Sequence, residues 1–150
     1  MLDTNICGYI IRNKPIYIKE KLKAIEKKHT IVLSSIVVAE ILFGLKKKNS
    51  PQLSNIVKSF LDNFIVYDFD KFAANEYAII RDYLEKEGNI IGSNDLFIAS
   101  HAKSLNAILV TNNTKEFSRI KDLKIEDWTI ENQLLESARK IKNSANEELE

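Results

Sequence analysis

Short β-branched runs that alternate with longer helix-forming stretches constrain the fold of this chain more than any other feature. The clearest runs lie at 30–33 (TIVL), 64–67 (FIVY) and 107–110 (AILV), and each is followed by a helix-forming stretch. Residues 1–3 resemble the end of a first strand, and 125–128 are expected to form an edge strand. This alternation predicts an α/β fold with a mostly parallel central sheet flanked by helices on both faces.

Helix caps and prolines mark where the intervening helices begin and end. We expect helices at 4–11, from Pro15 to 27, from Ser34 or Ser35 to about Gly44, and at 51–63, 71–87, 94–105 and 114–117. Asp70 and Ser93 are the expected N-caps of two of them, and Gly88 closes one. The length of 150 residues suits a single domain, which we place at 1–130 with a charged helical extension at 131–150.

Composition excludes several classes of protein. The net charge of +1 gives no general preference for nucleic acid, so a basic surface has to be local, as at Lys46–Lys48. Cys7 is the single cysteine and lies in an apolar stretch, so it predicts a buried side chain and excludes an intramolecular disulfide. The apolar runs are shorter than the roughly 20 residues of a membrane span, and we expect a cytoplasmic protein.

Four carboxylates interrupt apolar or neutral stretches. They are Asp3, Glu40, Asp95 and Glu116. Burying an unpaired carboxylate is costly, and the carboxyl ends of parallel strands form the edge where α/β folds bind ligands. We therefore expect these acids to meet there around Mg²⁺ or Mn²⁺, which prefer oxygen ligands. The two histidines and one cysteine predict no zinc site, and glycine-rich nucleotide motifs are absent from the sequence.

Short polar residues beside the acids are candidates to hydrogen-bond the carboxylates, a metal-bound water or a substrate phosphate. They are Thr4, Asn5, Thr111, Asn112 and Asn113. Structural interpretations stay open: Thr4 as a helix cap, the asparagine pair as a turn, and Asp3 and Asp95 as charges at helix N-termini. Glu116, beside Lys115, also suits an exposed helix. Glu40 fits an exposed position least well, since apolar residues precede and follow it.

Five short motifs then occur in order along residues 1 to about 130. They are DTN at 3–5, S-x-x-x-x-E-x-x-x-G at 35–44, N-D-x-x-I-A-x-H-A at 94–102, T-N-N-x-x-E-F at 111–117 and L-x-x-E-D-W at 123–128. Together they resemble a PIN-domain ribonuclease and, within that group, the VapC toxins of bacterial type II toxin–antitoxin modules.

The resemblance implies a three-layer PIN fold and Mg²⁺- or Mn²⁺-dependent endonucleolytic cleavage of RNA. Asp3, Glu40 and Asp95 match the acidic cluster of the family, and Asp3 and Asp95 match its metal ligands. Glu116 is the expected fourth catalytic carboxylate, because Asn113 stands where many members have aspartate. The implied partners are a VapB-like antitoxin, a second copy of the chain, an RNA substrate such as transfer RNA or its initiator form, and operator DNA reached only through the antitoxin.

Two other functions fit the same residues. A housekeeping PIN nuclease that processes RNA would share the acids but would have no antitoxin gene beside its own. A catalytically silent PIN-like binding module would keep the fold without binding Mn²⁺. A phosphoryl-accepting receiver domain fits less well, since Asp3 lacks an acidic neighbour in sequence.

Overall fold

The computed structural model describes residues 1–130, so the helical extension expected at 131–150 lies outside the described residues. Short strands and longer helices alternate along most of the described chain. In order they are α1 (Thr4–Arg12), α2 (Ile16–Ile25), β1 (Val32–Ser34), α3 (Ser35–Lys48), α4 (Pro51–Asp62), β2 (Ile65–Tyr67), α5 (Lys71–Lys86), α6 (Ser93–Ser104), β3 (Leu109–Val110), α7 (Thr114–Phe117) and β4 (Ile125–Glu126).

The strands are parallel, as the alternation of elements predicts. β1 pairs with β2 through Leu33 and Val66, and β3 pairs with β4 through Leu109 and Ile125. The N-terminal residues join these two pairs, because Leu2 forms a parallel bridge with Val110 and donates its backbone N–H to the carbonyl of Val32 at 3.2 Å. The pairing order is therefore β2, β1, residues 1–3, β3 and β4. The first strand expected at 1–3 is reduced to this bridge.

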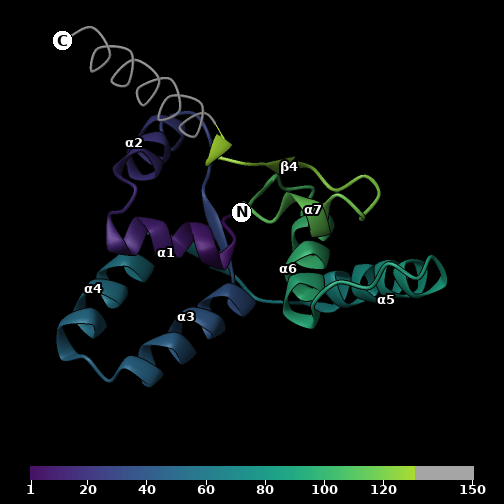
Figure 1. Cartoon of the computed structure of the whole chain (residues 1–150), viewed down its shortest axis with the longest axis horizontal. Coiled ribbons are helices and arrows are strands. Elements are labelled where there is room, and N and C mark those ends of the chain that lie inside the picture. Colours follow the sequence, from purple (N-terminus) through teal and green to yellow (C-terminus); the bar gives the residue numbers. More distant parts are fainter. Residues whose placement is uncertain (131–150) are drawn as a thin grey trace, which may run out of the picture.

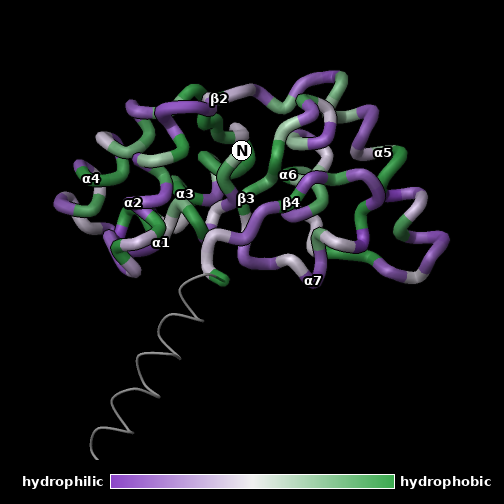
Figure 2. Tube along the Cα trace, turned by 90° about the horizontal axis from the view of Figure 1, so that it is seen from above, coloured by the Kyte–Doolittle hydropathy of each residue, from purple (hydrophilic) through white to green (hydrophobic). Residues whose placement is uncertain are grey.

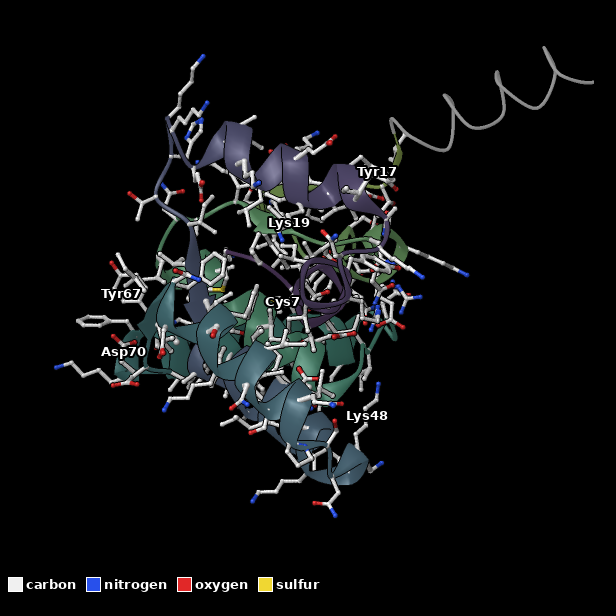
Figure 3. All side chains as sticks on the ribbon, turned by 90° about the vertical axis from the view of Figure 1, so that its left-hand side faces the viewer. Cys7, Tyr17, Lys19, Lys48, Tyr67 and Asp70 are labelled. Carbon is white, nitrogen blue, oxygen red and sulfur yellow. The ribbon has the colours of Figure 1, made fainter. Side chains whose placement is uncertain are left out.

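Helices lie on both sides of the strands. Figure 1 shows α1 to α4 on one side and α5 to α7 on the other, with the N terminus between them. Figure 2 shows that apolar stretches gather around the strands in the middle of the molecule. The core between the layers includes Leu2, Leu33, Ile98 and Leu109, all fully buried. Cys7 is buried in the interior, as predicted (Figure 3).

Local hydrogen bonds explain most helix starts. Ser34 caps α3 by accepting from the N–H of Ile36, and Asp70 caps α5 by accepting from those of Phe72 and Ala73. The N-cap expected at Ser93 is wrong. Gly92 occupies that position without a side-chain cap, and Ser93 is the first residue of α6.

Other boundaries also differ from the sequence-based expectation. The helix expected to end near Gly44 continues to Lys48, where Asn49 stops it in the left-handed conformation at φ 45°. Gly44 is tolerated within α3. The lysines in the last turn of α3 stabilise the helix, because their positive charges lie at the negative end of the helix dipole. Pro15 precedes α2 instead of lying in its first turn, and the strand expected at 30–33 lies at 32–34. Within residues 1–130, every helix is too short or too polar to cross a membrane.

Candidate active site

Asp3 is the most deeply buried of the four acids. It lies where the first bridge meets α1, and its side chain is 4% exposed. The N–H of Thr4 donates to its Oδ1 at 2.7 Å, and the hydroxyl of Thr111 donates to its Oδ2 at 2.7 Å. Both carboxylate oxygens thus have a donor, which makes burial of this acid tolerable.

Glu40 reaches the same place from the middle of α3. Its Oε1 accepts a hydrogen bond from the hydroxyl of Thr4 at 3.1 Å. Thr4 therefore holds two acids at once, Asp3 through its backbone and Glu40 through its side chain. The apolar run around Glu40 is less buried than its composition indicates, because Leu42 and Phe43 lie on an exposed face of the helix.

Asp95 and Glu116 form the other half of the cluster. Asp95 lies in the first turn of α6, and Glu116 lies in α7. The amide nitrogen of Asn113 lies 3.2 Å from Oδ2 of Asp95 and 3.3 Å from Oε2 of Glu116, and it donates to both. Glu116 therefore turns inward, in contrast to the exposed position that its neighbour Lys115 has.

Thr111 connects the two halves. Its hydroxyl donates to Asp3 and accepts from the backbone N–H of Asn113 at 3.0 Å. Thr111 is fully buried, so this hydroxyl has a fixed environment. The four acids expected to meet are thus gathered at one edge of the strands, and the threonines and Asn113 expected beside them contact them directly.

The proximity of the acids shifts their pKa values. Burial raises the pKa of Asp95 to about 6, and the charge of Asp3, a hydrogen bond to Glu116 and the charges of Glu116 and Glu40 raise it further. Burial raises the pKa of Asp3 as well, although the hydrogen bonds from Thr111 and Thr4 oppose the shift. Two acids with raised pKa values inside an acidic cluster gain from a nearby cation, which offsets the repulsion.

The donor set fits a hard divalent cation. All candidate ligands are carboxylate oxygens, and Mg²⁺ is usually bound by one or two carboxylates with waters and a substrate phosphate. Asp3 and Asp95 would supply that pair from opposite halves of the cluster. Among residues 1–130, no three acidic, histidine or cysteine side chains form a group that could hold a metal ion as they stand. The acids are gathered but are not closed into a complete cage.

The two remaining asparagines form a separate polar contact. Asn5 donates to the side-chain oxygen of Asn112 at 3.3 Å, and Asn112 donates to the hydroxyl of Tyr9 at 3.2 Å. Tyr9 was not among the sequence candidates, although it lies one helical turn after Asn5. Asn5 and Asn112 thus form a bond between α1 and the segment that follows β3, and their expected contact with a metal-bound water or a substrate phosphate stays a prediction.

A groove of about 260 Å³ runs away from the acids between α1, α3 and α4. Thr4, Asn5 and Glu40 line one part of it, and Arg12 and Lys48 also line it. Figure 3 shows Lys48 at the end of α3. The two preceding lysines do not line this groove. Lys47 lies over the ring of Phe43, and Lys46 lines a separate hollow beside Asn49.

A buried contact that the sequence did not reveal joins the helices carrying Glu40 and Asp95. Nδ1 of His101 on α6 lies 2.8 Å from the hydroxyl of Ser34, the N-cap of α3. Both residues are buried, and burial lowers the pKa of His101. The motif at 94–102 contains His101, but only the fold shows its partner.

Comparison with protein families gives a match to the PIN domain over residues 1–123. Ribonuclease VapC2 of Rickettsia felis is 46% identical over 129 residues, covering 85% of this chain and 96% of that protein. The tRNA(fMet)-specific endonuclease VapC of Shigella flexneri is 38% identical over 130 residues, covering 86% and 97%.

Solved structures show the same relationship. The VapBC2 complex of Rickettsia felis, bound to a promoter DNA fragment, contains a chain that superposes with a TM-score of 0.81 at 45% identity, covering 85% of this chain and 97% of that one. The DNA-bound VapBC of Salmonella typhimurium gives a TM-score of 0.79 at 38% identity, covering 85% and 96%. The three-layer α/β expectation is therefore confirmed.

Proposed function

Since the chain belongs to the PIN-domain family and to its VapC group, we propose that it is the endoribonuclease toxin of a toxin–antitoxin module and acts in the cytoplasm. One observation carries the proposal: Asp3, Glu40, Asp95 and Glu116, distant in sequence, are gathered at one edge of the strands by hydrogen bonds through Thr4, Thr111 and Asn113. Transfer RNA, and its initiator form in particular, is the proposed substrate, supported by the name of the Shigella flexneri relative.

The acids divide the chemistry between them. Asp3 and Asp95 would hold Mg²⁺ or Mn²⁺. When bound, such an ion lowers the pKa of a water molecule attached to it and offsets negative charge on the phosphate. Glu40 or Glu116 would orient the attacking water and accept its proton as the water oxygen bonds to phosphorus. The bond from phosphorus to the 3′ oxygen would then break, and that oxygen would take a proton from solvent. Thr4, Thr111 and Asn113 keep the acids in place throughout, since each contacts at least one of them.

RNA would approach along the groove beside Glu40. Arg12 and Lys48 line that groove and are suited to neutralise backbone phosphates next to the scissile one. Of the lysines Lys46–Lys48, which the sequence indicated as a local basic surface, only Lys48 is proposed to contact RNA. Lys46 lines a different hollow, and Lys47 lies over the ring of Phe43.

The partners follow from the related complexes. A VapB-like antitoxin would inhibit the toxin, and operator DNA would be bound through that antitoxin, as the DNA-bound VapBC structures support. A second copy of the chain completes the proposed assembly. Phe72, Ile79 and Tyr83, which follow one face of α5, are 64%, 53% and 43% exposed and offer an apolar surface for it. Sedimentation of wild type and an Ile79→Glu variant tests this contact; two monomeric proteins would contradict the dimer.

RNA-end sequencing and cleavage of purified transfer RNA test the activity. We expect cleavage with Mg²⁺, none in EDTA, and a loss of at least about 100-fold in Asp3→Asn and Asp95→Asn. Asp62→Asn, which makes the same change at an exposed position on α4, serves as the matched control and keeps full activity. Full activity in EDTA, or in both site variants, would contradict the proposal.

A further inference from the structure

Asn113 has a position that its local backbone does not explain. It precedes α7 with φ −89° and ψ 53°, so it does not require the left-handed conformation that asparagine tolerates, and its side chain does not cap the helix. The two usual reasons for asparagine at such a place, a turn and a cap, therefore do not apply. Its side chain points instead to two acids.

The amide group of Asn113 lies between those acids as a positive group would. A side-chain amide has two N–H donors, and here they serve Oδ2 of Asp95 at 3.2 Å and Oε2 of Glu116 at 3.3 Å. Two neighbouring carboxylates repel each other unless a donor, a cation or a shared proton lies between them. Asp95 and Glu116 can share a proton directly, and the need for another donor arises when both are ionised. The Asn113 amide supplies that donor without carrying a net charge.

The rest of Asn113 is fixed to the other half of the site. Its backbone N–H donates to the Thr111 hydroxyl, which in turn donates to Asp3. The amide is therefore held at a set distance from the Asp3 side of the cluster. Asn112 provides an internal contrast, since its side chain turns away from the acids toward Asn5 and Tyr9.

From these contacts we propose that Asn113 substitutes for a second cation. It keeps Asp95 and Glu116 together without an ion and restricts the acidic cluster to a single divalent ion, shared by Asp3 and Asp95. This inference rests on the metal dependence in the proposed function, but not on RNA cleavage.

Replacing Asn113 with aspartate turns an attractive contact with Asp95 and Glu116 into a repulsive one. The variant places a third carboxylate against Asp95 and Glu116 in place of two donors, so repulsion rises in the metal-free protein. The same change adds an oxygen ligand and negative charge for a divalent ion. Asn112→Asp adds the same charge one residue earlier, outside the contact, and is the matched control.

Calorimetric titration with Mn²⁺ and thermal unfolding in EDTA test the proposal. We expect one Mn²⁺ per wild-type chain. For Asn113→Asp we expect a second bound ion or a Kd lower by about tenfold or more, together with a metal-free Tm several degrees lower that Mn²⁺ restores. Asn112→Asp should match wild type in stoichiometry and Kd. Asn113→Ala removes the donors without adding a ligand, so it should lower the metal-free Tm and bind no extra ion.

Each other result would overturn the inference. Two ions or none on wild type, unchanged Mn²⁺ binding in Asn113→Asp, or the same gain in Asn112→Asp would each do so. Because the readouts are metal binding and unfolding, a wild-type protein that binds one Mn²⁺ but cuts no RNA would contradict the proposed function and leave this inference standing.

Discussion

The two halves of the acidic cluster are held in different ways. Asp3 is almost fully buried. Both of its carboxylate oxygens accept hydrogen bonds, one from the N–H of Thr4 and one from the hydroxyl of Thr111. Asp95 and Glu116 are half-buried on two different helices and share one amide, that of Asn113, at longer distances. Asp3 is thus part of the core, whereas the Asp95 half is assembled at its surface.

Because of this difference, we expect Asp3 to have a fixed position and the Asp95–Glu116 pair to have an adjustable spacing. An acid with two short hydrogen bonds in the core cannot move without breaking the fold. A pair of acids joined by one amide can change its spacing when that amide or a cation changes. We therefore expect substitutions on the Asp3 side to affect chemistry and folding together, and those on the Asp95 side to affect mainly ion binding and pH dependence.

The largest expected effect compares one acid from each half. Asp3→Asn should lower single-turnover RNA cleavage by at least about 100-fold, while Glu116→Gln should lower it by roughly tenfold, because Glu116 acts without being a proposed metal ligand. Circular dichroism checks that both variants are folded. Equal losses, or a larger one for Glu116→Gln, would show that Glu116 matters to the reaction at least as much as a proposed metal ligand.

Thr111→Val tests how firmly the buried half is held. The variant keeps the shape of the side chain but removes the hydroxyl that serves both Asp3 and Asn113. We expect the free energy of unfolding, measured in urea, to fall by about 1–3 kcal/mol. Thr4→Val, which removes only the half-buried contact to Glu40, should cost less. The reverse order would contradict the picture of a fixed Asp3.

The pH dependence of stability tests the surface half. The pKa of Asp95 is raised from 3.8 to about 6, so the folded state binds more protons than the unfolded state between these values. The stability of metal-free wild type should therefore fall as pH rises through that range. Asp95→Asn lacks this loss and should be more stable than wild type at pH 7.5, by about 1 kcal/mol after allowing for solvent screening.

That advantage should shrink as the pH falls from 6 and vanish below about pH 3, where Asp95 is protonated in both the folded and the unfolded state. Urea unfolding in EDTA across this pH range measures it. An advantage that grows toward low pH would have the wrong sign for a raised pKa and would refute the electrostatic argument.

The smallest expected effect concerns the groove that leads to the acids. In a cleavage-deficient Asp3→Asn background, Lys48→Ala should weaken RNA binding a few-fold and reduce the salt dependence of log K by about 1. Lys46→Ala removes the same charge from the same helix, but outside the groove, and should leave both nearly unchanged. Equal effects would indicate general charge attraction without a defined path for the RNA.

Much of the site could be predicted, because isolated acids in apolar stretches are visible in the sequence. Asp3, Glu40 and Asp95 were identified in this way, and Thr4, Thr111 and Asn113 by their adjacency to strand ends. The pairings could not be predicted. Nothing local indicates that Asn113 contacts Glu116 and Asp95 while Asn112 contacts Tyr9, since adjacent side chains in a bend diverge by angles that only the backbone sets.

Helix and strand boundaries show the same limit. The cap at Ser34 was one of two adjacent candidates, and the fold resolves it because the neighbouring Ser35 hydroxyl accepts from the N–H of Phe69. Ser93 is a residue type that commonly caps helices, but it is the first residue of α6 and Gly92 occupies the cap position. Gly44 has the residue type of a helix end but lies within α3, which ends where Asn49 adopts the left-handed conformation.

The sequence by itself determined the order of strands and helices, the oxygen chemistry of the acids and the family, since periodicity and short motifs are local properties. Only the tertiary structure decided which donor serves which carboxylate, how deeply each acid is buried and which lysine lies beside the groove. These depend on long-range packing: a carboxylate acquires its pKa and its partners from segments such as 111–116, which lie far from it in the chain and adjacent to it in space.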